Sequence, residues 1–151
     1  MKISDKMVET IKNNFGYTEQ EVQIWLENLR NKDVLSKSMG LLSKTIVLEV
    51  VKSHGCNSQH KVGDKFYFDG SGNLLTKFCP KKICIHALSA VEPLIFAANE
   101  LYYAGADPNE MRFNRVDCMA DVGLNCGGWG KVVMEIKVED RKKIKLERKQ
   151  R

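Results

Sequence analysis

One long apolar segment, residues 78–105, constrains the fold of this chain more than any other part of its sequence. Its apolar residues recur at the spacing that lays them along one face of an α-helix. They are Ile83, Ala87, Ala90, Val91, Leu94, Ile95, Ala98, Leu101 and Tyr102. Few polar side chains interrupt this pattern, so we expect a helix that is buried on more than one side and that contributes much of the stability.

Two prolines and a glycine predict the course of this helix. Pro80 suits the first helical position, because a proline there loses no hydrogen bond, and this places Cys79 at or near the N-cap. Pro93 lies inside the pattern, where its ring clashes with the preceding turn and predicts a kink. Gly105 is typical of a helix end.

The segments around this helix are typical of strands. Residues 44–53 alternate in polarity, with Ile46, Leu48 and Val50 on one face. Further strand patterns lie at 65–69, 111–118 and 131–139. The order strand, strand, helix, strand, strand predicts an α+β domain in which the long kinked helix covers one face of an antiparallel sheet.

The first 43 residues are typical of short helices. Apolar residues at helical spacing occupy 7–15 and again 22–29. Thr18 is followed three residues later by Glu21, which is the arrangement of a capping box. A third helical segment is expected at 33–42. None of these segments has a basic face, so a DNA-binding helix-turn-helix is disfavoured, and packing against the next domain or a second subunit is favoured.

The length and the charge distribution predict the organisation of the chain. Its 151 residues are enough for one hydrophobic core and too few for two ordinary domains. We therefore expect a helical extension at 1–43, an α+β domain at 44–140 and a basic tail at 141–151. The tail carries seven Lys and Arg residues against one acid, which exceeds the net charge of +5 of the whole chain. The basic charge is thus confined to the tail, and nucleic-acid binding is disfavoured.

The sequence also predicts where the protein resides. It contains no apolar run long enough to span a membrane and no N-terminal segment of the signal-peptide type. Its five cysteines, an odd number, argue against a secreted disulfide framework. We therefore expect a cytoplasmic protein without a membrane partner.

The cysteines and histidines fall in three groups at the ends of the predicted elements. The groups are His54, Cys56 and His60, then Cys79, Cys84 and His86, then Cys118 and Cys126. Loops from separate elements can converge on one metal ion. We therefore predict a zinc ion, an iron ion or an iron–sulfur cluster held by Cys56, His60, Cys84, Cys118 and Cys126. No Cys-x-x-Cys motif supports this set, and the alternative is that these residues are ordinary thiols, with Cys84 a small buried apolar residue.

A second interpretation is thiol chemistry centred on Cys79. A thiol at a helix N-terminus experiences the helix dipole, and the neighbouring Lys77, Lys81 and Lys82 add positive charge that favours the thiolate. Cys79 is then a redox or nucleophilic cysteine, and Cys84 its resolving partner. A nucleophile also needs a positioned base, which the spacing of the residues does not identify.

Several motifs of the α+β region carry a resemblance. They are CNSQHKVGD at 56–64, CIHAL at 84–88, a cysteine-bearing loop, and VVMEI at 132–136. Over residues 44–138 or so, the chain resembles a family of small uncharacterised prokaryotic cysteine-containing proteins. That family has no established activity, so the resemblance implies a cytoplasmic domain with recurring cysteines and implies nothing about a substrate.

Three functional hypotheses follow from the sequence. The leading one is a small metal-binding accessory protein or small subunit in anaerobic metabolism, acting with a protein partner or as a homo-oligomer. The second is a thiol-dependent redox enzyme that uses Cys79 and Cys84. The third is a structural interaction module without a metal.

Overall fold

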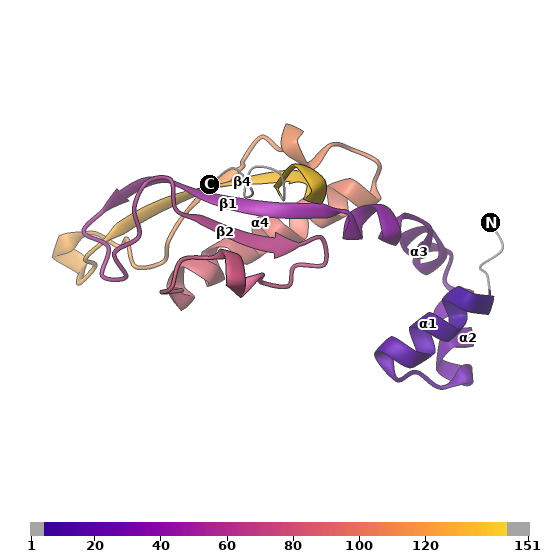
Figure 1. The fold of residues 1–151 in the computed structure, drawn as a ribbon. Coiled ribbons are helices and arrows are strands. Elements are labelled where there is room, and N and C mark those ends of the chain that lie inside the picture. Colours follow the sequence, from indigo (N-terminus) through magenta and orange to yellow (C-terminus); the bar gives the residue numbers. More distant parts are fainter. Residues whose placement is uncertain (1–4, 145–151) are drawn as a thin grey trace. The chain divides into compact units, whose positions relative to one another are not determined.

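The computed structural model describes residues 5–144, and the chain divides into two compact units, Met1–Gly40 and Leu41–Arg151 (Figure 1). The first unit is helical. The second contains the sheet, the long helix and all of the cysteines. No helix within residues 5–144 is both long and apolar enough to cross a membrane.

The first unit contains α1 (Asp5–Phe15), α2 (Glu19–Glu27) and most of α3 (Leu29–Leu42). Ile11, Val22 and Leu35 form its buried core. The capping box is confirmed: the Thr18 amide donates to Glu21 Oε2 at 2.7 Å, and the Glu21 amide donates to Thr18 Oγ1 at 3.3 Å. These two bonds satisfy amides that have no partner within the helix.

The third helix starts earlier than the sequence predicts. It begins at Leu29 and not at 33, because Asn28 ends α2 with an extended backbone, and its side-chain oxygen accepts the Arg30 amide at 2.9 Å. Asparagine is a favoured N-cap residue for this reason. Leu29 is 77% exposed and does not continue the apolar stripe of α2.

The second unit is built on a four-stranded antiparallel sheet. Its strands are β1 (Lys44–His54), β2 (Lys65–Asp69), β3 (Arg115–Asp117) and β4 (Lys131–Asp140), in the spatial order β2-β1-β4-β3. Leu48 of β1 lies opposite Phe66 on one side and Ile136 on the other. The predicted α+β class with an antiparallel sheet is therefore confirmed.

The third strand is shorter than predicted. Only Arg115–Asp117 pairs as a strand, not 111–118, and residues Pro108–Glu110 before it form a 3-10 turn (η2). The side chain of Asn109 in this turn accepts the Val138 amide at 2.9 Å and donates to the Val138 carbonyl at 3.0 Å. A side chain thus replaces the strand neighbour that β4 lacks at this point.

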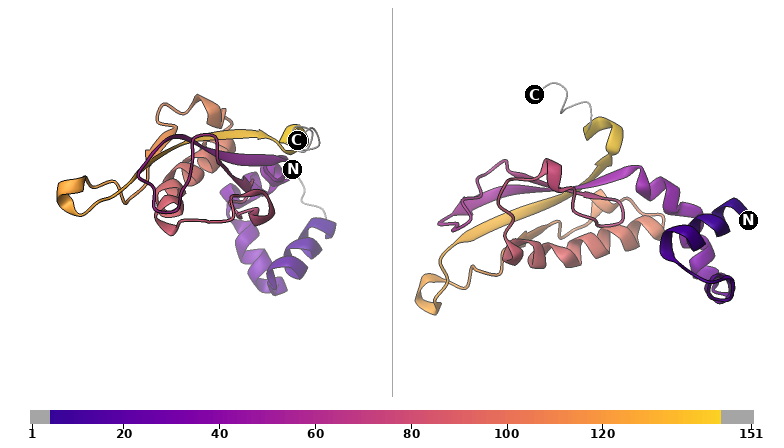
Figure 2. Two further views of the ribbon diagram at one scale, coloured as in Figure 1. Left: turned by 60° about the vertical axis from the view of Figure 1, so that its left-hand side comes forward. Right: turned by 60° about the horizontal axis from the view of Figure 1, so that its bottom comes forward.

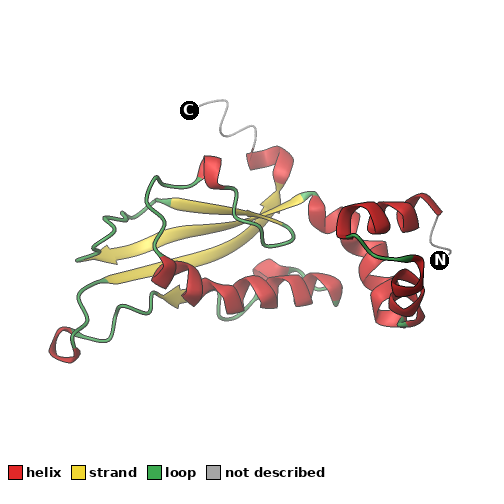
Figure 3. Cartoon of the chain, turned by 90° about the horizontal axis from the view of Figure 1, so that it is seen from below, coloured by secondary structure: helices red, strands yellow, loops and turns green. Residues whose placement is uncertain are grey.

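The long helix, α4 (Ile85–Tyr103), lies along one face of the sheet (Figure 3). The predicted inward face of β1, formed by Ile46, Leu48 and Val50, is fully buried and faces this helix. The same core contains Ala87, Val91 and Ala98 of α4 and Val132, Met134 and Ile136 of β4. The right-hand view of Figure 2 shows the same arrangement of helix and sheet.

The predicted start of α4 is wrong by five residues. The helix begins at Ile85, and its N-cap is Cys84, not Cys79. The Tyr67 amide of β2 donates to Cys79 Sγ at 3.4 Å and holds Cys79 in an extended conformation after the 3-10 turn η1 (Thr76–Phe78). Because of this contact with the sheet, the chain reaches the first α-helical hydrogen bond only at Cys84, whose carbonyl accepts the Leu88 amide at 3.1 Å.

The expectation that α4 is buried on more than one side is also wrong in the single chain. Ile85 is 67% exposed and Phe96 is 62% exposed on the face away from the core. Pro93 lies within the helix, which runs through it without a break; the kink stays a prediction.

We expect the Leu48→Ala variant to lose about 2–5 kcal/mol of unfolding free energy, because the lost side chain leaves a cavity between the sheet and α4. Urea unfolding measures this loss. The matched control is Leu124→Ala, since Leu124 is 83% exposed and the same change there should cost less than about 0.5 kcal/mol. Equal losses in the two variants would contradict the packing described for β1.

Candidate active site

Four of the five cysteines contact one core. Cys56, Cys79 and Cys84 are half-buried and pack against this core. Cys118 is buried and belongs to the core itself. Cys126 is exposed in the 3-10 turn η3 (Leu124–Cys126), and His60 is buried. Within residues 5–144, no three His, Cys, Asp or Glu side chains lie in an arrangement that could hold a metal ion. The five-residue ligand set therefore stays a prediction.

Cys84 occupies the N-cap of α4, a helix of 19 residues. Burial has the largest single influence on its thiol and by itself raises the pKa. That influence is outweighed by donors that favour the thiolate, namely the Ala87 amide, the Ser58 hydroxyl and the His86 amide, so the pKa lies below the ordinary value of a cysteine. The neutral thiol makes no capping hydrogen bond to the helix, and the amides act on the charged form.

The loop between β1 and β2 supplies one of these donors. It contains a turn in which the Gln59 amide donates to the Cys56 carbonyl at 2.9 Å, and Ser58 lies inside this turn. Gln59 has a φ of 63° and is the one non-glycine residue within 5–144 with a positive φ. Its side-chain oxygen accepts a hydrogen bond from Lys82 Nζ at 3.2 Å. The loop is thus held against the segment that leads into α4, in a conformation that costs about 1 kcal/mol or more.

The same loop ends in a buried histidine. The side chain of His60 is 2% exposed, and its ring lies edge-on to Phe66, with the ring centroids 5.1 Å apart. Nδ1 lies 3.7 Å from the Asp64 carboxylate, whereas Nε2 has no hydrogen-bond partner. Phe66 belongs to the core under α4, so this imidazole lies on the same face of the sheet as Cys84. A buried polar atom without a partner costs about 1–3 kcal/mol.

A close backbone contact fixes the base of the loop. Gly55 has a φ of 62°, and a Cβ on Gly130 would lie only 2.7 Å from the Gly55 carbonyl oxygen and 3.2 Å from the Cys56 Cα. Only glycine fits at position 130. The segment that enters β4 is therefore packed directly against the loop that carries Cys56 and His60.

Cys79, the predicted nucleophile, has a different environment. Its sulfur accepts the Tyr67 amide and lies 3.5 Å from the Leu75 carbonyl, to which the thiol donates. These contacts close the η1 turn against β2. The sulfur of Cys79 thus has a structural role in the fold, and the helix-capping thiol is Cys84.

Two contributors to the site were not predicted from the sequence. Ser58 and Gln59 lie in a polar loop whose residues match no catalytic motif, and nothing in the local sequence indicates a positive φ at Gln59. The one available signal was the alternation of Cys56, Ser58 and His60, which brings three reactive side chains into one short loop.

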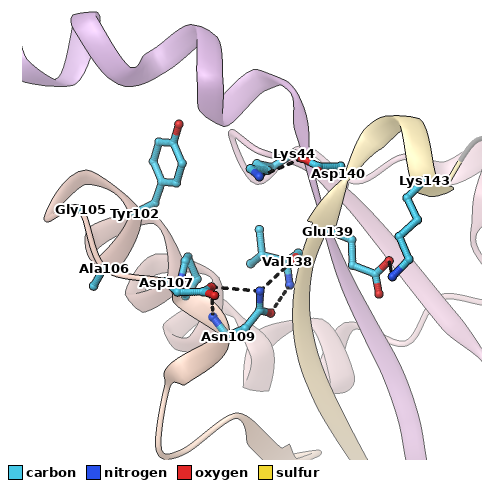
Figure 4. A pocket seen from close by; sticks show the side chains of 11 residues that line it. Lys44, Tyr102, Gly105, Ala106, Asp107, Asn109, Val138, Glu139, Asp140 and Lys143 are labelled. Atoms are coloured by element: carbon cyan, nitrogen blue, oxygen red, sulfur yellow. Dashed lines mark hydrogen bonds and ion pairs between the residues drawn. The ribbon is translucent and has the colours of Figure 1, made fainter.

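A pocket with a volume of about 540 Å³ lies at the opposite end of α4 from Cys84 (Figure 4). Lys44 donates to Asp140 at 2.8 Å and Lys143 lies 3.1 Å from Glu139, so these acids are paired with lysines. The residues that line this pocket include no cysteine, histidine or serine. The pocket offers space without a nucleophile and is the weaker candidate.

We expect the Ser58→Ala variant to raise the pKa of Cys84, because the thiolate loses a hydrogen-bond donor. Site-resolved alkylation of Cys84 at neutral pH should become several-fold slower. Ser89→Ala is the matched control, since Ser89 is exposed on the same helix. If both variants alkylate at the wild-type rate, Ser58 does not stabilise the thiolate.

The comparison of this chain with known proteins found no relative. No family model, no curated protein and no solved structure matches the chain. The resemblance to a family of small prokaryotic proteins stays a prediction, and the candidate function rests on the geometry around Cys84.

Proposed function

We propose that this protein is thiol-dependent and that Cys84 is its reactive group. One observation carries the proposal: Cys84 caps a 19-residue helix that lowers its pKa, while its side chain remains partly accessible. Thiolates at helix N-termini are the reactive cysteines of many enzymes and redox sensors. This revises the expected thiol pair, because Cys84 takes the role that the sequence gives to Cys79.

The environment of Cys84 suits attack on a soft electrophile. A thiol with a lowered pKa depends less on a dedicated base. The backbone amides at the N-terminus of α4 and the Ser58 hydroxyl favour the charged form of the sulfur, and Lys81 and Lys82 lie exposed in the preceding segment. The two lysines favour an electrophile that carries negative charge.

We expect iodoacetamide at neutral pH to label Cys84 faster than Cys126, although Cys126 is the more exposed of the two. At about pH 10 the order should reverse, because ordinary thiols are then ionised and exposure decides the rate. Peptide mass spectrometry of the partially labelled full chain measures both rates.

The control is the Cys84→Ser variant, which should lose the fast-labelling site and keep the slow ones. A wild-type Cys84 that labels more slowly than Cys126 at every pH would contradict the proposal.

We retain metal binding as a second proposal, supported by His60. A metal-ligating histidine commonly directs one ring nitrogen to a carboxylate and the other to the ion. His60 has this arrangement, with Asp64 beside Nδ1 and no partner at Nε2. The sulfur of Cys84 would be the second ligand, since a deprotonated cysteine binds zinc and iron. Binding of zinc or iron further requires Cys56, Cys118 or Cys126 to move, since these donors do not converge with the others within residues 5–144.

Protein purified without oxygen should contain close to one zinc or iron per chain if this second proposal holds, and His60→Ala should lose the metal while remaining folded. Elemental analysis with circular dichroism measures both. Asp107→Ala is a control acid far from the loop, in the pocket at the other end of α4. Less than about 0.2 metal per wild-type chain would end the proposal.

A further inference from the structure

A second thiol lies in the loop that contacts Cys84. Cys56 begins the turn closed by the Gln59 amide, and the Gln59 side chain accepts a hydrogen bond from Lys82, two residues before Cys84. Lys82, in the segment before α4, donates this hydrogen bond at 3.2 Å. Both cysteines also contact the same core on the same face of the sheet. Cys56 and Cys84 therefore lie on two separate segments that the bond between Gln59 and Lys82 joins.

The other three cysteines are placed differently. The sulfur of Cys79 is bonded to backbone groups of Tyr67 and Leu75. Cys118 is 8% exposed, and its amide donates to the Val132 carbonyl at 2.9 Å. Cys126 lies in the loop before β4, which Figure 2 shows extending beyond the ends of the strands. Cys56, by contrast, lies in the turn whose Gln59 side chain is bonded to Lys82, two residues before Cys84.

We infer that Cys84 and Cys56 form a redox pair: a hydroperoxide oxidises Cys84, and Cys56 then closes a disulfide with it. This inference rests on the proposed reactivity of Cys84 and adds the class of oxidant and the second thiol.

The chemistry proceeds in two balanced steps. In the first, the Cys84 thiolate attacks the terminal oxygen of the hydroperoxide. The S–O bond forms, the O–O bond breaks, and the departing alkoxide takes a proton from solvent to leave as an alcohol, or as water from hydrogen peroxide. Sulfur is oxidised to the sulfenic acid and the peroxide is reduced. In the second, the Cys56 sulfur gives up its proton and attacks the Cys84 sulfur; the S–S bond forms, the S–O bond breaks, and the hydroxide leaves with that proton as water.

The disulfide requires the 56–60 loop to move onto Cys84. A disulfide needs its two Cα atoms about 4.4–6.8 Å apart. The bond between Gln59 and Lys82 is exposed, so little is lost if it breaks as the turn moves. The left-handed backbone of Gln59 and the unpartnered Nε2 of His60 make the reduced loop a costly conformation. A rearrangement of the 56–60 loop can relieve both costs.

The test uses the full chain, reduced and then treated with one equivalent of hydrogen peroxide. Proteolysis without reductant and mass spectrometry should recover most of Cys84 in a disulfide with Cys56 of the same chain. In Cys56→Ser, the Cys84 sulfenic acid should persist and be trapped by a cyclic 1,3-diketone at a level at least about tenfold above wild type. The matched control, Cys126→Ser, should form the disulfide as wild type does, since Cys126 is exposed.

The outcomes separate the two proposals. A disulfide from Cys84 to Cys79, Cys118 or Cys126, or to a second chain, overturns the pair. So does oxidation of wild-type Cys84 that ends in a sulfenic or sulfinic acid, although the reactivity proposed for Cys84 then stands. A Cys84 that resists both peroxide and fast alkylation overturns the proposed function together with the pair. The mapping on wild-type protein needs no variant to fold.

Discussion

The β1–β2 loop is tied to the head of α4, and the other features of the site depend on this contact. Gln59 accepts a hydrogen bond from Lys82, two residues before Cys84, and the Ser58 hydroxyl is one of the groups that lower the pKa of Cys84. The bond between Gln59 and Lys82 keeps the loop that carries Ser58 next to the segment that carries Cys84, at the first amides of α4. Together these donors outweigh the burial that would otherwise keep the thiol neutral. The consequence is a half-buried thiol with a lowered pKa.

The rigid part of the domain makes this contact reproducible. The antiparallel register sets Leu48 between Phe66 and Ile136, and α4 packs on the face they form. The contact between Gly55 and Gly130 fixes the base of the loop against the entry to β4. A reactive group held by packed elements keeps its geometry better than one on a free loop. The strain at Gln59 is therefore concentrated where the chemistry is proposed.

The features of the fold that could be predicted are those that depend on residues close together in the sequence. The alternation of residues 44–53 assigned Leu48 to the core, and the capping box at Thr18 was read correctly, because each depends on neighbours in sequence. The start of α4 was missed because the Tyr67 amide, twelve residues away, takes Cys79 as a hydrogen-bond partner. No periodicity encodes such a contact. The sequence predicted Cys84 as a metal ligand or as the resolving partner of Cys79, and its place at the N-cap of α4 could not be predicted without the helix boundary.

The most direct test of a thiolate at the head of α4 is a pH titration of thiolate ultraviolet absorbance, in wild-type protein and in the Cys84→Ser variant. The lowered pKa of Cys84 predicts that wild type shows a titration step below the ordinary cysteine value of about 8.5, and that the variant lacks this step. If the two proteins titrate identically below that pH, Cys84 is an ordinary thiol, and the helix and the Ser58 hydroxyl do not activate it.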